Sequence, residues 1–455
     1  MRGTIRRSRF FCSLCIAITL LVGSAIQPQF GLAASEESVT ASTKSAPATH
    51  KQQKVISVAN TKAGEKLEDF CVDADGRIFA LLAPAGPNDG GGVSLLGALF
   101  GAKPSAKKGP PFACAVHVFD ADGKLSEKWP VEFSGQAIST APDGTILVGG
   151  DGRVARFDVH GKKLLEAESP QMTYINKNPE EMRARAKEQL ESDRATYSEQ
   201  VKQFEEQLLE LKKSKKAPKD SKKPAKDEAA DESEFDIRTN EQSLKQMVSL
   251  YKQQLQVLEK KTVEETLQEV LMGAKRTHSL SASDKDVFVT CPAMAGYGYG
   301  VWRTDEKFGQ AKEIVKSLSG CCGQMDVQCR NGELYVCENS RHRVVRFNRE
   351  GKIVSEFGKR DREGEGENFG GCCNPMNLCF SKDGNLYVSE SNGAVKHFTP
   401  DGKYLGMVGV AKVDAGCKNS CVAVTADDSR LYYIDINKSQ IIVLARNDDA
   451  AKKSQ

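Results

Sequence analysis

A pattern of four short apolar segments recurs along the chain. In the clearest copies the segments are separated by a turn that ends in Gly, a polar turn, and an Asp-Gly or similar pair. The clearest copies cover residues 325–358 and 375–409, and Asp383-Gly384 marks one of the hairpin turns. Short apolar segments bounded by such turns are typical of antiparallel strands. The pattern therefore predicts repeated sheets of four strands.

Six copies of the pattern can be placed, which predicts an all-β fold, a six-bladed β-propeller. They cover residues 70–129, 136–166, 279–318, 325–358, 375–409 and 422–444. The sixth copy lacks its last strand, and residues 54–60 resemble the last strand of the fourth copy. We therefore expect the N-terminal strand to complete the final blade and close the ring, which would protect the sheet edges. Residues 54–177 would hold this strand and blades 1 and 2, and residues 274–446 blades 3 to 6.

The ring is interrupted by residues 178–273, where Glu, Lys, Gln, Leu and Ala dominate. Asn178 and Pro179 suit the first positions of a helix. Two apolar series with three- and four-residue steps predict an antiparallel coiled-coil hairpin of two helices. The series are Leu190, Tyr197, Val201, Phe204, Leu208 and Leu211, then Leu244, Val248, Tyr251, Leu255 and Leu258. We expect this helical arm to contact a protein partner or a second copy of the chain; the alternative is that it packs on the propeller without a binding role.

Both ends of the chain differ from the repeats. Residues 1–34 hold an arginine-rich start, an apolar run from Phe10 to Gly23 and then small residues, which is the pattern of a cleaved export signal. Residues 35–53 and 447–455 offer little to bury and are expected to be a disordered linker and a disordered tail. No later segment is long and apolar enough for a transmembrane helix. We therefore expect the mature protein in the periplasm or at the cell surface.

Composition argues against some functions. The chain has 455 residues, with 64 basic and 61 acidic side chains and a net charge of +3. This balance gives no overall field that would attract nucleic acid, so no nucleic-acid partner is expected. No Ser/His/Asp grouping or carboxylate pair stands out, so no catalytic residue is assigned and an enzyme is the less favoured interpretation.

Two segments carry a resemblance to a known family. Residues 385–391 are Asn-Leu-Tyr-Val-Ser-Glu-Ser and residues 333–339 are Glu-Leu-Tyr-Val-Cys-Glu-Asn, each followed by a strand ending in Phe and then by Asp-Gly or Glu-Gly. These segments resemble NHL repeats, and the resemblance is good over residues 321–409. It implies a propeller, here of a bacterial exported type, whose faces bind macromolecules or, in some branches, hold a lyase or lactonase site. The lyase branch uses several histidines at the channel, whereas the six histidines of this chain are scattered.

The chain has 14 cysteines, two of which lie in the expected signal. Five others precede the innermost strands of three consecutive blades: Cys321, Cys322, Cys372, Cys373 and Cys417. Three more border loops that open on the same face of the propeller: Cys114, Cys291 and Cys337. We expect all eight to emerge on that face, with the first five around the channel mouth. Three states of these thiols stay open: disulfides, which export and the even count favour; a site for zinc, copper or an iron–sulfur cluster; or a redox-active dithiol.

The sequence thus predicts a binding or scaffold platform with a cysteine-rich face at the channel mouth. The alternative is a metal- or iron–sulfur-binding protein with redox or lyase-like activity at that face. His342 lies in a loop on the same side and is interpreted as a solvated surface residue rather than a metal ligand.

Overall fold

The computed structural model describes residues 48–61, 64–85, 114–216, 230–294, 297–362, 364–414, 416 and 418–447. The expected export signal (1–34), most of the expected linker (35–53) and the expected tail after Asn447 lie outside these ranges. Cys417 also lies outside the described residues.

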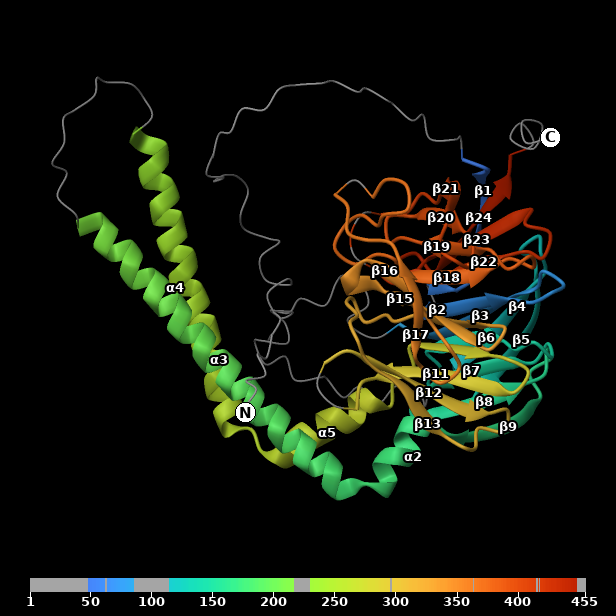
Figure 1. Ribbon diagram of the computed structural model, residues 1–455, viewed down its shortest axis with the longest axis horizontal. Coiled ribbons are helices and arrows are strands. Elements are labelled where there is room, and N and C mark those ends of the chain that lie inside the picture. The colour runs from blue at the N-terminus through green and yellow to red at the C-terminus, as the bar shows by residue number, and fades with distance from the viewer. Residues whose placement is uncertain are drawn as a thin grey trace, which may run out of the picture. The chain divides into compact units, whose positions relative to one another are not determined.

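Within the described residues, 24 strands form six antiparallel sheets of four strands each (Figure 1). The first sheet holds β2 (Glu65–Val72), β3 (Ile78–Pro84), β4 (Cys114–Phe119) and β5 (Leu125–Val131). The second holds β6 (Ala137–Thr140), β7 (Ile146–Gly150), β8 (Arg153–Phe157) and β9 (Lys163–Glu168). The third holds β10 (Ser279–Ala282), β11 (Asp286–Pro292), β12 (Tyr299–Asp305) and β13 (Lys312–Leu318).

The other three sheets repeat the same order. The fourth holds β14 (Val327–Arg330), β15 (Glu333–Glu338), β16 (Arg343–Phe347) and β17 (Ile353–Phe357), with a 3₁₀ turn, η2 (Asn339–Arg341), between its second and third strands. The fifth holds β18 (Asn377–Phe380), β19 (Leu386–Ser389), β20 (Ala394–Phe398) and β21 (Tyr404–Val410). The sixth holds β22 (Val422–Val424), β23 (Arg430–Asp435), β24 (Gln440–Arg446) and β1 (His50–Ser57).

The first strands of the six sheets contact one another in chain order. β2 contacts β6, β6 contacts β10, and the series continues through β14 and β18 to β22, which contacts β2 again. Six four-stranded sheets around a common centre are the blades of a propeller. The number of blades expected from the repeats is therefore the number found.

Strand β1 supplies the fourth strand of the sixth blade. It pairs antiparallel with β24, from His50 opposite Arg446 to Ser57 opposite Gln440. The strand begins at His50, inside the segment expected to be a linker, and not at Lys54. The residues before Lys54 are polar and carry no apolar signal, but β24 offers them backbone partners and the buried His50 Nε2 donates a hydrogen bond to the Asp428 carbonyl at 2.9 Å.

The hydrophobic core is divided into layers between neighbouring blades. One layer joins Tyr432 and Ile434 of the sixth blade to Phe70 and Ile78 of the first. Middle strands such as β3 are buried on both faces, which explains why they are continuous apolar runs and do not alternate with polar residues. The core therefore holds adjacent blades together as much as it stabilises each sheet.

The Gly of the turn between the third and fourth strands packs against the preceding blade. Gly161 has a φ of +82°, and a Cβ there would overlap the ring of Trp129 in the blade before it. Gly402 has a φ of +85° and lies in the same way against Phe357. The glycine of the turn between the third and fourth strands is therefore required both by its positive φ and by the packing of one blade on the next.

Four helices lie in the described part of the insertion between blades 2 and 3. They are α2 (Pro170–Lys177), α3 (Pro179–Lys216), α4 (Ala230–Lys260) and α5 (Val263–Ala274). The helical region thus starts before the expected boundary at Asn178, because Met172 and Ile175 of α2 are buried in the core layer of blades 2 and 3. The returning segment is also divided at Thr262, which caps α5 by accepting a hydrogen bond from the Glu265 amide.

Helices α3 and α4 pack against each other along the apolar series found in the sequence. Tyr251 of α4 lies between Tyr197 and Phe204 of α3, with ring centroids 5.5 and 5.2 Å away. Near the base, Arg194 Nε donates a hydrogen bond to the Leu258 carbonyl at 2.9 Å. The side chain of Arg185 also bonds the carbonyl of Met294 between β11 and β12. The base of the arm is therefore attached to the third blade.

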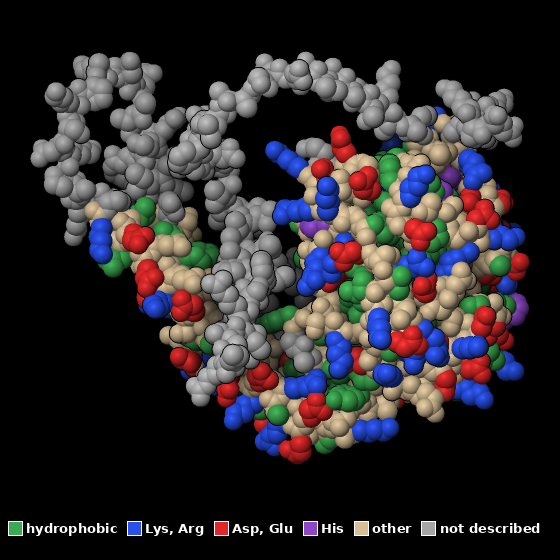
Figure 2. Space-filling model, viewed as in Figure 1, with side chains coloured by type: hydrophobic (Ala, Val, Ile, Leu, Met, Phe, Trp, Pro, Cys, Tyr) green, Lys and Arg blue, Asp and Glu red, His purple; other side chains and the backbone are tan. Residues whose placement is uncertain are grey.

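The described surface is strongly polar on the side in view. Figure 2 shows basic and acidic side chains intermixed over the propeller, with no large region of one sign on that side. Among the described residues, no helix has both the length and the apolar content that crossing a membrane requires.

Candidate metal centre and central channel

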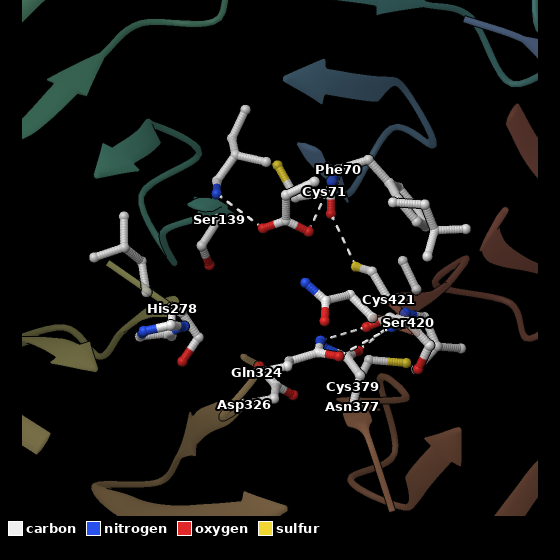
Figure 3. Close-up of a pocket in the computed structure, with 18 of the residues that line it drawn as sticks. Phe70, Cys71, Ser139, His278, Gln324, Asp326, Asn377, Cys379, Ser420 and Cys421 are labelled. Carbon is white, nitrogen blue, oxygen red and sulfur yellow. Dashed lines mark hydrogen bonds between the residues drawn. The ribbon is translucent and has the colours of Figure 1, made fainter. Parts of the chain in front are cut away.

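The innermost strands of all six blades line a central cavity of about 320 Å³ (Figure 3). Its wall is rich in amides, hydroxyls and carboxylates. At one end Gln324 spans from the fourth to the sixth blade: its Nε2 donates to the Ser420 carbonyl at 2.5 Å, and its Oε1 accepts from the Ser420 amide at 2.9 Å. Gln324 belongs to the loop that carries Cys321 and Cys322, so this loop is tied to the channel wall.

Polar side chains connect each blade to the next, five of them from the channel wall and the sixth, Ser439, from the turn between β23 and β24. In every case a side-chain oxygen accepts a hydrogen bond from a backbone amide at or near the innermost strand of the following blade. The pairs are Asp69 with Ile138 (3.0 Å), Gln136 with Thr277 (3.0 Å), Ser279 with Val327 (3.1 Å), Asp326 with Leu378 (2.8 Å), Asn377 with Val422 (2.9 Å) and Ser439 with Leu67 (3.1 Å). These side chains satisfy amides that no neighbouring strand could reach, so their first role is structural.

Burial changes the ionisation of the channel groups. Loss of hydration raises the pKa of Asp326 to about 7 and that of Asp69 to about 6, although each carboxyl accepts backbone hydrogen bonds that act in the opposite direction. Burial, assisted by Arg276, lowers the pKa of His278 to about 4. Near neutral pH the channel therefore holds a neutral imidazole and partly protonated carboxyl groups.

The cysteine loops before β14 and β18 meet beside this channel. The Sγ atoms of Cys321, Cys322 and Cys373 all lie within 4.8 Å of one another. Cys322 Sγ is 3.6 Å from Cys321 Sγ and 3.1 Å from Cys373 Sγ, and Cys372 Sγ is 3.0 Å from Cys373 Sγ. The structure thus brings together four of the five cysteines expected at the channel mouth, and the fifth, Cys417, is outside the described residues.

The first cysteine loop is held by the end of strand β15. Asn339 Oδ1 accepts a hydrogen bond from the Cys321 amide at 2.7 Å, and Glu338 Oε1 accepts one from the Ser319 amide at 2.9 Å. Glu338 is buried and forms an ion pair of 2.5 Å with Arg343. The backbone of this loop is therefore held by Asn339 and by Glu338, and the side chain of Glu338 is itself held by Arg343.

The second cysteine loop is held in a related way. Glu390 Oε2 accepts a hydrogen bond from the Gly370 amide at 3.2 Å, and Asn374 Nδ2 donates one to the Gly370 carbonyl at 2.8 Å. Glu390 also pairs with Lys396 at 2.8 Å, both buried. Glu338 and Glu390 occupy the same place in their repeats. Neither residue was among the expected site residues, although their shared place, separated from Leu-Tyr-Val by one residue, is a signal in the sequence for a common role.

Contacts between the thiols shift the pKa values of Cys321 and Cys373 in opposite directions. Hydrogen bonds from Cys322 and then Cys373 lower the pKa of Cys321 well below its ordinary value. Hydrogen bonds of Cys373 with Cys321 and then with Cys322 raise the pKa of Cys373. The group therefore favours one thiolate, at Cys321, with protonated thiols around it, and a thiolate is the form that binds metal ions.

Three cysteines that were expected to emerge on this face do not reach it. Cys114, Cys291 and Cys337 are each 1% exposed or less and belong to core layers between blades. Each lies at the end of a strand, where the alternation of side chains directs the sulfur into the layer and away from the loop. His342, expected at the surface, is also mostly buried, and burial lowers its pKa.

Three other cysteines face the channel. Cys71, Cys379 and Cys421 line the cavity, and Cys421 Sγ donates to the Phe70 carbonyl at 3.3 Å (Figure 3). Burial raises the pKa of all three thiols. They are therefore protonated and poorly suited to bind a metal ion, in contrast to Cys321.

The donor set at the cysteine loops suits a soft metal ion. Zn–S bonds of about 2.3 Å in a tetrahedral site place neighbouring sulfurs roughly 3.8 Å apart. The separations in the structure are 3.1 and 3.6 Å, with all three sulfurs within 4.8 Å, so small side-chain movements would bring the sulfurs to this spacing. Thiolates favour zinc, copper(I) and iron–sulfur clusters over hard cations. Cys321, Cys322 and Cys373 could therefore hold such an ion.

Comparisons with known proteins show likeness only among solved structures. No family model matches the sequence, and no curated protein matches it. A calcium-binding protein, regucalcin, from Agrobacterium tumefaciens is 12% identical, with a TM-score of 0.43 over 88% of this chain and 96% of that chain. A gluconolactonase from Xanthomonas campestris is 11% identical, with a TM-score of 0.38 over 89% of this chain and 99% of that chain. The propeller assignment rests on the sheet topology described above.

Proposed function

We propose that this protein is an exported, NHL-type propeller that binds a soft metal ion at its cysteine-rich end and serves there as a binding platform. The observation that carries the proposal is the approach of Cys321, Cys322 and Cys373, whose sulfurs lie within 4.8 Å of one another. The NHL assignment rests on the repeated segments at residues 333–339 and 385–391.

A shared metal ion accounts for this arrangement better than disulfides alone. A single disulfide joins two sulfurs and leaves the third thiol beside it, and a bridge between adjacent cysteines such as Cys321 and Cys322 is strained. One ion bound by three thiolates uses all of them. It also protects them from oxidation in an exported protein, where thiols cannot be assumed to stay reduced.

The proposal is tested by metal analysis of the full chain purified without oxygen. We expect about one equivalent of a soft metal ion in the wild-type protein and its loss in Cys373→Ser, because removing one of three thiolates opens the site. Cys329→Ser, a substitution in the following strand, is the matched control and should retain the metal. A metal-free wild-type protein, or mass spectrometry that finds Cys321, Cys322 and Cys373 in disulfides, would contradict the proposal.

Export is part of this proposal and has a separate test. If residues 1–34 are a cleaved signal, the protein recovered from its native cells should start near Ala33 or Ala34 and fractionate with periplasmic or surface proteins. Intact-mass measurement of that protein checks both points. Recovery of the uncleaved chain from the cytoplasm would count against export and would leave the metal site unaffected.

The helical arm supports a second role, contact with a protein partner or another copy of the chain. Leu209 of α3 and Val257 of α4 are 52% and 59% exposed, which is costly for apolar residues on an otherwise polar arm. Replacing residues 195–257 with a short Gly-Ser linker keeps the base of the arm, where Arg194 bonds Leu258. We expect this variant to lose self-association in light scattering or partner capture by cross-linking. No change in either measurement would mean that the arm has no binding role.

A further inference from the structure

The cysteine loops of blades 4 and 5 bring sulfurs from different blades into contact. Cys322 Sγ lies 3.1 Å from Cys373 Sγ, which belongs to the following blade. Two further close pairs are neighbours in the sequence: Cys321 and Cys322, at 3.6 Å, and Cys372 and Cys373, at 3.0 Å. A disulfide between adjacent residues is strained, whereas residues from two loops are free of that restriction. Cys322 and Cys373 are therefore well placed to form a disulfide.

We propose that a low-molecular-weight disulfide oxidises Cys322 and Cys373 to a disulfide and thereby releases the metal ion. This inference rests on the proposed metal-binding function of the same loops, and it adds to that function its regulation by oxidation. The site then has two states, a metal ion held by three thiolates and a metal-free disulfide beside the Cys321 thiol. The amount of bound metal follows the redox state of the surroundings.

Unequal exposure of the two sulfurs sets the order of the reaction. Cys322 is partly exposed, whereas Cys373 is buried and only 1% exposed. A dissolved disulfide therefore reaches Cys322 and forms a mixed disulfide there. The Cys373 sulfur lies 3.1 Å away, so it displaces the small thiol by attack within the same molecule, which is favoured over attack by a second molecule from solution.

Contacts that do not involve sulfur keep the two loops together when the ion leaves. The Asn339 side chain bonds both the amide and the carbonyl of Cys321, at 2.7 and 3.4 Å. In the second loop, Glu390 accepts a hydrogen bond from the Gly370 amide at 3.2 Å, and the buried Lys396 holds Glu390. An S–S bond is about 2.0 Å long, so the two sulfurs must approach each other by roughly 1 Å. Side-chain rotation covers this distance and leaves these anchors intact.

The reaction is balanced in atoms and electrons. The Cys322 thiolate attacks one sulfur of the small disulfide R–S–S–R, that S–S bond breaks, and RS⁻ leaves. The Cys373 thiolate then attacks the Cys322 sulfur, and a second RS⁻ leaves. Both leaving groups take up protons from water, so two thiolates lose two electrons and one disulfide is reduced to two thiols. The ion keeps its charge and leaves, because the one remaining thiolate does not hold it.

Titration of the zinc-loaded full chain with oxidised glutathione, without oxygen, tests this inference. A colorimetric zinc chelator measures the released ion, and a sample without oxidised glutathione gives the background. Mass spectrometry of alkylated peptides identifies the joined cysteines. We expect about one equivalent of zinc to be released for each glutathione disulfide consumed, with Cys322 joined to Cys373 and Cys321 alkylated.

Three cysteine variants sharpen this test. Cys329→Ser, in strand β14, is the matched control and should release zinc as the wild-type protein does. Cys372→Ser removes the exposed neighbour of Cys373 and should still form the same disulfide. Cys373→Ser removes the thiol that resolves the mixed disulfide, so glutathione should stay attached at Cys322. This last result does not depend on bound metal.

The other outcomes separate a failure of the inference from a failure of the metal site. Zinc that stays bound in excess oxidised glutathione, or a disulfide between any other pair of cysteines, overturns the inference and leaves the metal site intact. A Cys373→Ser variant that binds as much zinc as the wild-type protein, or a wild-type protein that binds none, shows that the metal site itself is misassigned, and the inference falls with it.

Discussion

Asp326 combines a structural hydrogen bond with an unusual ionisation. Its carboxyl accepts a hydrogen bond from the Leu378 amide, and the residue is 2% exposed. Burial raises the pKa of Asp326 to about 7. The unfolded chain binds this proton only below about pH 4. Between those values the folded protein binds the proton more tightly, so the contribution of Asp326 to the free energy of unfolding is largest at low pH and declines as the pH rises through 7.

Asp326→Asn should remove this pH-dependent contribution to the free energy of unfolding, while the side-chain oxygen can still accept the hydrogen bond from the Leu378 amide. The wild-type protein should therefore lose about 1–3 kcal/mol of stability relative to the variant between pH 5 and pH 8. Urea unfolding of both proteins at several pH values measures the difference. Parallel stability curves would mean that Asp326 titrates as an ordinary carboxyl in the folded protein.

Two glycines separate the cost of a turn from the cost of packing. Gly161 and Gly144 share a φ of +82°, but only Gly161 lies against Trp129, and nothing lies within 4 Å of a Cβ placed at Gly144. Gly144→Ala should cost about 1 kcal/mol of unfolding free energy for backbone strain, and Gly161→Ala a further 1–3 kcal/mol for overpacking. Chemical denaturation measures both. Equal costs would show that the contact between blades is adaptable.

At the scale of elements, β1 holds the sixth blade closed. A protein without residues 1–47 retains all of β1, whereas removal of residues 1–57 exposes the edge of β24 and uncovers the core around Ile56. We expect the first truncation to match the full chain in thermal unfolding. The second should lower stability by at least about 3 kcal/mol and promote aggregation. Equal melting temperatures for the two truncations would contradict this role of β1.

The blades could be predicted because their signals are local: Asp-Gly turns and apolar strands recur in order. Helix α2 and the first residues of β1 could not, because Met172 is buried by a neighbouring blade and His50 by the edge of β24. The grouping of Cys322 with Cys373 followed from their shared place in two repeats. The burial of Cys337 could not be predicted from the repeats, because the direction of a side chain near the end of a strand depends on the register of that strand.

At the scale of the whole molecule, the propeller brings residues that are far apart in sequence to one end of a channel. Cys322 and Cys373 belong to different blades, so a metal ion between them joins the blades only in the folded protein. Binding should therefore stabilise the fold, by about 2.7 kcal/mol when the free ion is at 100 times its dissociation constant. Thermal unfolding with and without copper(I) measures this, and Cys373→Ser should show no increase. An equal increase in that variant would place the ion elsewhere.

The claim that Cys321, Cys322 and Cys373 hold one metal ion is tested most directly by X-ray absorption spectroscopy at the metal edge of the oxygen-free, full-length protein. The structure predicts a first shell made of sulfur, at about 2.3 Å if the ion is zinc and at a similar distance for copper(I). A first shell of nitrogen and oxygen alone would contradict the account.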